Sequence, residues 1–172
     1  RNTRLELQFD NDTYLRIDEN SSVKIVSLGE EGSAFSIAEG TLLLSVFEYD
    51  PSGGYLEIDA PRTTVAVAEA EKYRIDAGNE YDRNVKVAVC DGGTARVYSV
   101  DSGFTLKNDQ SASMALDGAY AGRWSVARHS GMRDGFDDWS ASRDELINDS
   151  LKDSFYGRYY DDDLYGADDL ND

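Results

Sequence analysis

Short runs of alternating apolar and polar residues fill the first three quarters of the chain, and they limit what it can fold into. Leu5, Leu7 and Phe9, for example, alternate with polar residues, which is the period of a half-buried strand. Similar runs recur to about residue 128, separated by turns rich in Asp, Asn and Gly. This spacing predicts a mainly β fold of about a dozen short strands. A β-sandwich and a short β-helix-like roll share the period, so both stay open.

Two local patterns refine this prediction. The apolar parity changes at Val26 and Leu28, which indicates a bulge in the third strand. The run from Thr41 to Phe47, separated by Glu39-Gly40 from the preceding strand, is apolar on both faces. We therefore expect it at the centre of the fold. Further strands are expected at 55–59, 63–68, 71–77, 85–89, 95–99, 104–106, 110–116 and 123–128.

The last 40 residues differ in composition from the rest. Arg133 to Asp172 contain 13 acidic and 4 basic residues. Phe136, Trp139 and Ile147 fall on one face of a helix expected at about 134–154, with Gly157 as its stop. The segment after it is expected to have little regular structure. The predicted organisation is a β domain over residues 1–130 and an acidic helical, Tyr-rich extension over residues 131–172 that packs on it.

Charge and cysteine content exclude several classes of protein. The 172 residues include 34 acidic and 17 basic ones, a net charge of −17. Such a chain is a poor match for nucleic acid or for an anionic membrane surface. A single Cys excludes an internal disulfide and a cysteine-built zinc site. No apolar run is long enough to span a bilayer, and a chain that starts at Arg1 is expected to be an excerpt of a longer protein.

Few residues suggest chemistry, and for each the plainer interpretation is favoured. Consecutive Asp residues near the end could bind calcium, but their spacing does not match an EF-hand and a solvated tail is expected. A carboxylate pair beside the first hairpin could hydrolyse a glycan, but turn formation explains these acids. We predict no catalytic, metal-binding or cofactor-binding residue. The residues considered were Asp161, Asp162, Asp163, Asp168 and Asp169 for calcium, Asp10, Asp12, Asp18 and Glu19 for hydrolysis, His129 for a catalytic triad, and Cys90 for an intermolecular disulfide.

The aromatic residues of the extension are the candidates for partner binding. Tyr and Trp offer large, rigid, amphipathic surfaces that suit a protein partner or an envelope glycan. The competing interpretation is that helix and tail cap an open end of the β domain. The candidates are Trp139, Tyr156, Tyr159, Tyr160 and Tyr165.

An ordered series of β motifs resembles the FecR domain, the extracytoplasmic part of bacterial ferric-citrate-type sensor proteins. The resemblance covers about residues 1–118 and depends on the order of the motifs. They are Gly40-Thr-Leu-Leu-Leu-Ser-Val46, Tyr55-Leu-Glu-Ile-Asp-Ala-Pro61, Val65-Ala-Val67, Tyr73-Arg-Ile-Asp76, and Val85-Lys-Val-Ala-Val89 with Gly93-Thr-Ala-Arg-Val97.

Two features make the chain similar to a FecR-like branch outside iron signalling. Glu71-Lys-Tyr-Arg-Ile75 replaces the usual "G-T-x-F-x-V", and an acidic helix motif, Phe136-Asp-Asp-Trp-Ser-Ala-Ser-Arg-Asp144, follows the β domain. The resemblance implies an all-β fold, an envelope location and a non-enzymatic role. It favours a binding or scaffold module. The alternatives are an extracytoplasmic signal-sensing regulator of the anti-sigma factor type and, remotely, a carboxylate-based glycan hydrolase.

Overall fold

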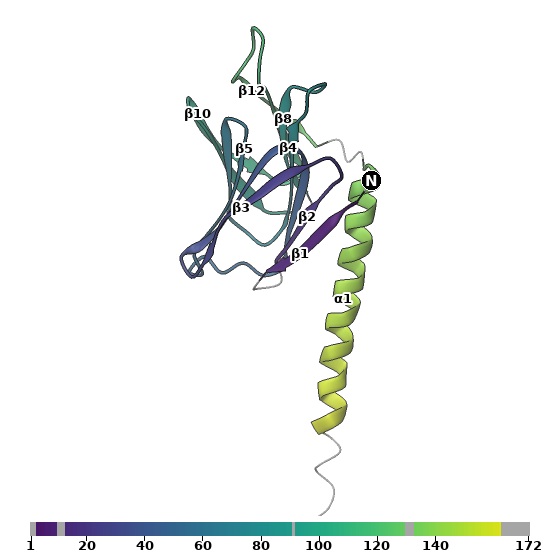
Figure 1. Ribbon diagram of the computed structural model, residues 1–172. Helices are drawn as coiled ribbons and strands as arrows, with labels where there is room; N and C mark the ends of the chain where they lie inside the picture. Colours follow the sequence, from purple (N-terminus) through teal and green to yellow (C-terminus); the bar gives the residue numbers. More distant parts are fainter. Residues whose placement is uncertain (1–2, 10–12, 91, 130–132, 163–172) are drawn as a thin grey trace, which may run out of the picture. The chain divides into compact units, whose positions relative to one another are not determined.

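The computed structural model describes residues 3–9, 13–90, 92–129 and 133–162 (Figure 1). Side chains are described as far as residue 150. The chain divides into two units, Arg1–Met132 and Arg133–Asp172. The first holds the strands and the second holds the helix. Each unit is considered by itself below.

The described residues of the first unit form twelve strands, which confirms the mainly β prediction. Their positions agree with the alternating runs of the sequence because each run buries one face. The strands are β1 Leu5–Phe9, β2 Thr13–Ile17, β3 Ser22–Gly29, β4 Gly32–Val46, β5 Tyr55–Ala60, β6 Thr63–Val67, β7 Lys72–Gly78, β8 Asn84–Cys90, β9 Thr94–Ser99, β10 Ser102–Lys107, β11 Gln110–Ala115 and β12 Trp124–Arg128.

Strand β4 joins two layers of one curled sheet. Its first part lies in the layer β3-β4-β5-β6-β9-β10, where it runs parallel to β5. Its second part lies in the layer β1-β2-β4-β7-β8-β11-β12, between β2 and β7. The layers therefore face each other as in a sandwich while remaining one hydrogen-bonded sheet.

The Glu39-Gly40 interruption is a bend inside β4 and not a break between two strands. Gly40 has φ 87°, and a Cβ there would collide with Ser21. The Ser21 hydroxyl accepts from the Thr41 amide at 2.9 Å and donates to the Thr41 carbonyl at 3.1 Å. These two bonds hold the chain through the bend, so the ladder continues on its far side.

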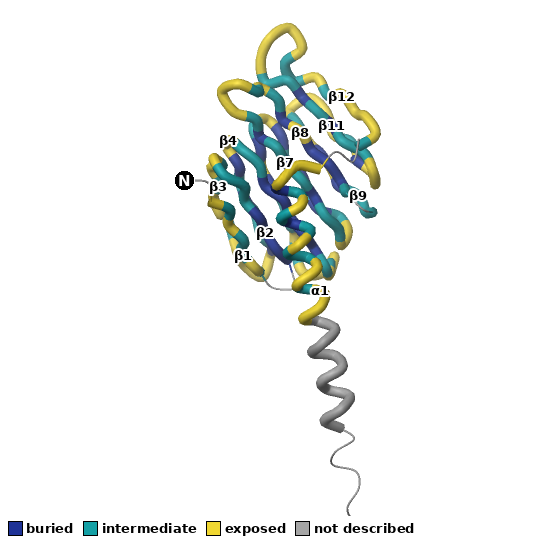
Figure 2. The backbone as a smooth tube through the Cα atoms, turned by 90° about the vertical axis from the view of Figure 1, so that its right-hand side faces the viewer, coloured by how far each residue is buried: buried dark blue, intermediate teal, exposed yellow. Residues whose placement is uncertain are grey.

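The core lies between the two layers. The central position predicted for the run from Thr41 to Phe47 is confirmed, because Leu42, Leu43 and Leu44 are each at most 1% exposed. Figure 2 shows buried segments through the middle of the strands and exposed turns at their ends. The predicted bulge is confirmed too, since the pairing of β3 with β4 shifts register between Ile25 and Ser27.

In the part of the second unit that the structure describes there is one helix, α1 Gly135–Asp162. Asp134 caps its start, where its Oδ1 accepts from the amides of Phe136 at 2.9 Å and Asp137 at 3.0 Å. The predicted stop at Gly157 is wrong. A glycine inside a helix costs only about 1 kcal/mol relative to alanine, and no proline follows it. Within the described residues, no helix combines the length and the apolar character needed to cross a membrane.

Candidate functional site

A cavity of about 610 Å³ opens at one end of the β domain, and we call it the mouth. It lies where the end of β1 and the start of β2, the β3–β4 turn, and the loop from β4 to β5 meet. The volume is in the range of small-ligand sites. The mouth is the open end of the space between the two layers, since the inner residues of both contribute to it.

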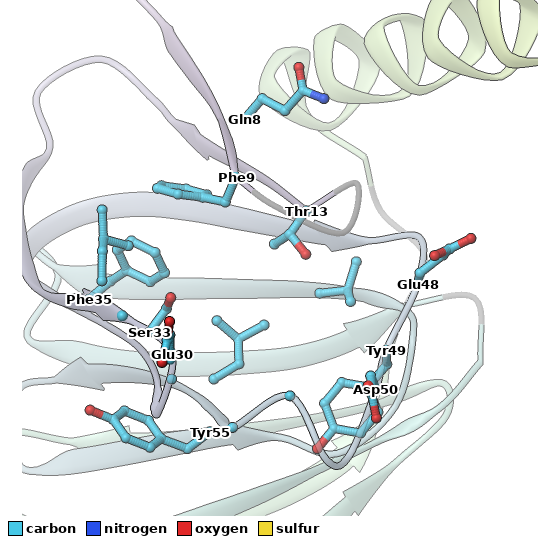
Figure 3. A pocket seen from close by; sticks show the side chains of 17 residues that line it. Gln8, Phe9, Thr13, Glu30, Ser33, Phe35, Glu48, Tyr49, Asp50 and Tyr55 are labelled. Carbon is cyan, nitrogen blue, oxygen red and sulfur yellow. The ribbon is translucent and has the colours of Figure 1, made fainter.

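Aromatic and aliphatic side chains form the walls of the mouth. The rings of Phe9 and Phe35 lie 5.0 Å apart between centroids, and Phe35 is fully buried. Figure 3 shows these two rings side by side, with Tyr49 and Tyr55 at the other edge of the cavity. Tyr49 packs against the core, whereas Tyr55 is 44% exposed. The inner part of the mouth is therefore continuous with the hydrophobic core.

The rim of the mouth is acidic. Its lining includes Glu30, Glu48 and Asp50, and all three are exposed. Hydroxyls of Thr13 and Ser33 add neutral polar groups. Among the described lining residues there is no Lys or Arg. An apolar cavity edged by carboxylates favours ligands that carry both an apolar part and a positive charge.

Hydrogen bonds within its own loop hold the carboxylate of Asp50 in place. Its Oδ1 accepts from the Ser52 hydroxyl at 2.6 Å and from the Ser52 amide at 2.8 Å. These two bonds hold the pKa of Asp50 below its ordinary value of 3.8, and the bond from the Ser52 hydroxyl has the larger effect. A carboxyl with a lowered pKa stays ionised at neutral pH, which suits charge recognition and not proton donation.

A close backbone contact fixes the shape of the rim. The amide of Tyr55 donates to the carbonyl of Glu31 at 3.1 Å. Gly54 has φ 99°, and a Cβ there would collide with the same carbonyl oxygen. Only glycine lets the β4–β5 loop approach the β3–β4 turn in this way.

The residues predicted for partner binding lie elsewhere. Trp139 is half-buried on α1, with its ring stacked on Phe136 at 5.8 Å between centroids. Tyr156, Tyr159 and Tyr160 fall within α1, but their side chains are outside the described residues, as is all of Tyr165. Their role stays a prediction.

The other candidates for chemistry are scattered. Asp18 forms an ion pair with Arg4 at 2.9 Å, and the amide of His129 donates to the Asp109 carbonyl at 2.6 Å. Cys90 is a half-buried thiol at the end of β8. Glu19 is half-buried next to Asp18. No cluster of potential metal ligands occurs in the part of the chain that the structure describes. The backbone of Asp161 and Asp162 is helical, while Asp10, Asp12, Asp163, Asp168 and Asp169 lie outside the described residues.

Sequence reasoning missed the mouth. Its residues come from three stretches, 8–13, 28–35 and 46–56, and each read separately as a strand end or a turn. One signal was present. The loop Asp50-Pro51-Ser52-Gly53-Gly54 is flanked by Tyr49 and Tyr55, and aromatic residues on both sides of a glycine-rich loop can serve ligand binding.

The fold and the mouth define a small β domain with a ligand-sized recess between its layers. The family model described as FecR protein matches residues 1–94. The match covers more than half of the chain, and the chain belongs to the FecR protein family. The comparison with curated proteins found no match.

Solved structures share the fold. One is a crystal structure of a candidate anti-sigma factor from Parabacteroides distasonis ATCC 8503, with a TM-score of 0.62 and 13% sequence identity. A second crystal structure with the same description has a TM-score of 0.60 and 14% identity. Each match covers 74% of this chain and 56% of the other. The chain therefore spans little more than half of the proteins that it resembles.

Proposed function

We propose that this chain is the sensing part of a FecR-type regulator, which receives a signal outside the cytoplasm and passes it to a transcriptional partner. The observation that carries the proposal is the FecR protein match over residues 1–94. The same fold in proteins described as anti-sigma factors supports it. These findings favour a signalling regulator over the more general binding or scaffold module.

We further propose that the domain acts by binding and not by catalysis. The mouth offers aromatic walls, hydroxyls and a carboxylate rim, which are groups that recognise a ligand. Asp50, whose pKa is lowered, would be a poor general acid, and Asp18 and Glu19, two of the acids considered for hydrolysis, are not among the described residues that line the mouth. A carboxyl that donates its proton in such a reaction needs a raised pKa.

Two measurements in the native host test the proposal. The first fuses alkaline phosphatase, which is active only outside the cytoplasm, to the gene after the codon for Asp172. We expect activity, and an inactive but stably produced fusion would contradict the location.

The second measurement deletes residues 1–132 from the chromosomal gene and follows transcription across the genome. If the chain is part of a regulator, the change in transcription should be confined to the promoters that one sigma factor recognises. Glu80→Gln, at an exposed position, serves as a control that should leave transcription unchanged. Transcription that does not respond to the deletion would favour the scaffold module instead.

A further inference from the structure

The outer edge of β3 is an exposed, apolar edge of the sheet. Within the described residues, β3 is hydrogen-bonded to β4 alone, so its other edge has no strand beside it. Ile25, Val26 and Leu28 are 45%, 51% and 52% exposed. Proteins commonly cover or charge such an edge to prevent unwanted pairing. Here only Lys24 and the bulge at Val26 interrupt it.

This edge leads directly into the mouth. Leu28 belongs to both, because it is a residue of β3 and also lines the cavity. Gly29 and Glu30, which follow it, line the cavity as well. Across the turn, the Tyr55 hydroxyl lies 3.1 Å from the Ser27 hydroxyl. The aliphatic edge and the acidic rim thus form one continuous surface.

The charge of this surface restricts what can cover it. Glu30, Glu48 and Asp50 stand on the rim, and the described lining has no basic side chain to neutralise them. The ligand must therefore supply positive charge next to apolar groups. An extended chain with alternating basic and apolar residues has this composition, because its side chains point to opposite faces.

We propose that the mouth and the adjoining edge of β3 form a docking site for an extended basic segment of a protein partner. Its backbone adds to the edge at Ser27–Gly29, where the strand runs into the mouth. An apolar side chain lies against Leu28, and a Lys or Arg reaches the carboxylates of the rim. The proposal depends on the proposed function, since it describes how a sensing domain would meet its partner.

The test measures fluorescence anisotropy of a labelled peptide in which valine and lysine alternate, titrated with the full chain. A peptide with glutamate in place of lysine is the charge control, and spermidine is the competitor without a peptide backbone. We expect binding of the lysine peptide that weakens with salt. Absence of binding, equal binding of the glutamate peptide, or displacement by spermidine at an equal concentration would each overturn the proposal.

Matched variants locate the site. Glu30→Gln, Glu48→Gln and Asp50→Asn together should weaken binding at least about tenfold. The same loss of charge at exposed Glu80, Asp101 and Glu145 should change it less than about twofold. Equal weakening by the two sets would mean that net charge alone attracts the peptide, and would overturn the site.

A second pair of variants tests the edge. Leu28→Ser should weaken binding at least about tenfold, whereas Val100→Ser, at a position 88% exposed, should not. Unchanged binding by Leu28→Ser would overturn the role of β3. These binding results do not depend on transcription. The docking site can therefore be refuted while the proposed regulatory function is supported, or the reverse.

Discussion

Replacing Tyr73 by Phe should make the stability of the β domain less sensitive to high pH. Tyr73 is fully buried in β7, and its hydroxyl lies 2.7 Å from the Glu69 carbonyl and 3.1 Å from the Thr94 carbonyl. Burial raises its pKa well above the ordinary value of 10, with the charges of Glu69 and Glu71 adding to the shift. The side chain therefore stays protonated in the folded state when unfolded chains begin to ionise.

The sign of the pH effect follows from the raised pKa. The contribution of Tyr73 to stability is complete below pH 10 and is lost as the pH rises above it. At neutral pH the variant should lose about 1 kcal/mol, which is the typical net contribution of one hydrogen bond to stability. By pH 11 the wild type should lose about 1.4 kcal/mol that the variant keeps. The two stability curves should therefore cross between about pH 10 and 11.

Guanidinium unfolding from pH 7 to 11 measures this crossing, followed by far-ultraviolet circular dichroism. Tyr81→Phe is the matched control, because Tyr81 is 89% exposed and lies outside the core. Its curve should run parallel to that of the wild type. A constant gap between the wild type and Tyr73→Phe over the whole range would refute the reasoning, since Tyr73 would then ionise as easily in the folded protein.

Three further perturbations have defined outcomes. Glu6→Gln should lower the free energy of unfolding by roughly 2–3 kcal/mol, because Glu6 accepts from the fully buried Arg16 at 2.7 Å; pairing it with Arg16→Met should recover part of the loss. Gly54→Ala should destabilise by about 1–3 kcal/mol, whereas Gly29→Ala, with open space around its Cβ, should not, as thermal unfolding can show. Deleting residues 133–172 should lower the melting temperature if the extension caps the β domain, and an unchanged value would refute capping.

The strands were predictable because burial of one face leaves a period of two in the sequence. The bulge at Val26 was predictable for the same reason, as the parity of apolar residues changes there. The continuity of β4 was not. It depends on Ser21, twenty residues before Thr41, whose hydroxyl holds the bend at Gly40. A contact of this kind leaves no periodic signal. From the sequence alone, Glu39-Gly40 therefore indicates a break between two strands.

The mouth was not predictable because strand order creates it. β4 pairs with β2 on one layer and runs parallel to β5 on the other. These two pairings bring residues near 9, 30 and 50 to one end of the domain. Alternation shows that a strand exists but not which strand lies beside it. The helix end was missed for a different reason, since Gly157 is a stop only where the backbone leaves the helical region.

The acidity of the chain has two distinct consequences for binding. The net charge of −17 attracts any cation from a distance, and salt screens this attraction evenly. The three carboxylates of the mouth are a small part of that charge, but they stand beside aromatic walls and an open strand edge. Charges that a bound peptide covers, as we propose for the carboxylates of the mouth, affect mainly the dissociation rate, whereas charges that stay in solvent affect mainly the association rate. Neutralising the rim should therefore speed release of a basic peptide, while neutralising the acidic extension should slow its capture, and the two effects can be separated in one stopped-flow experiment.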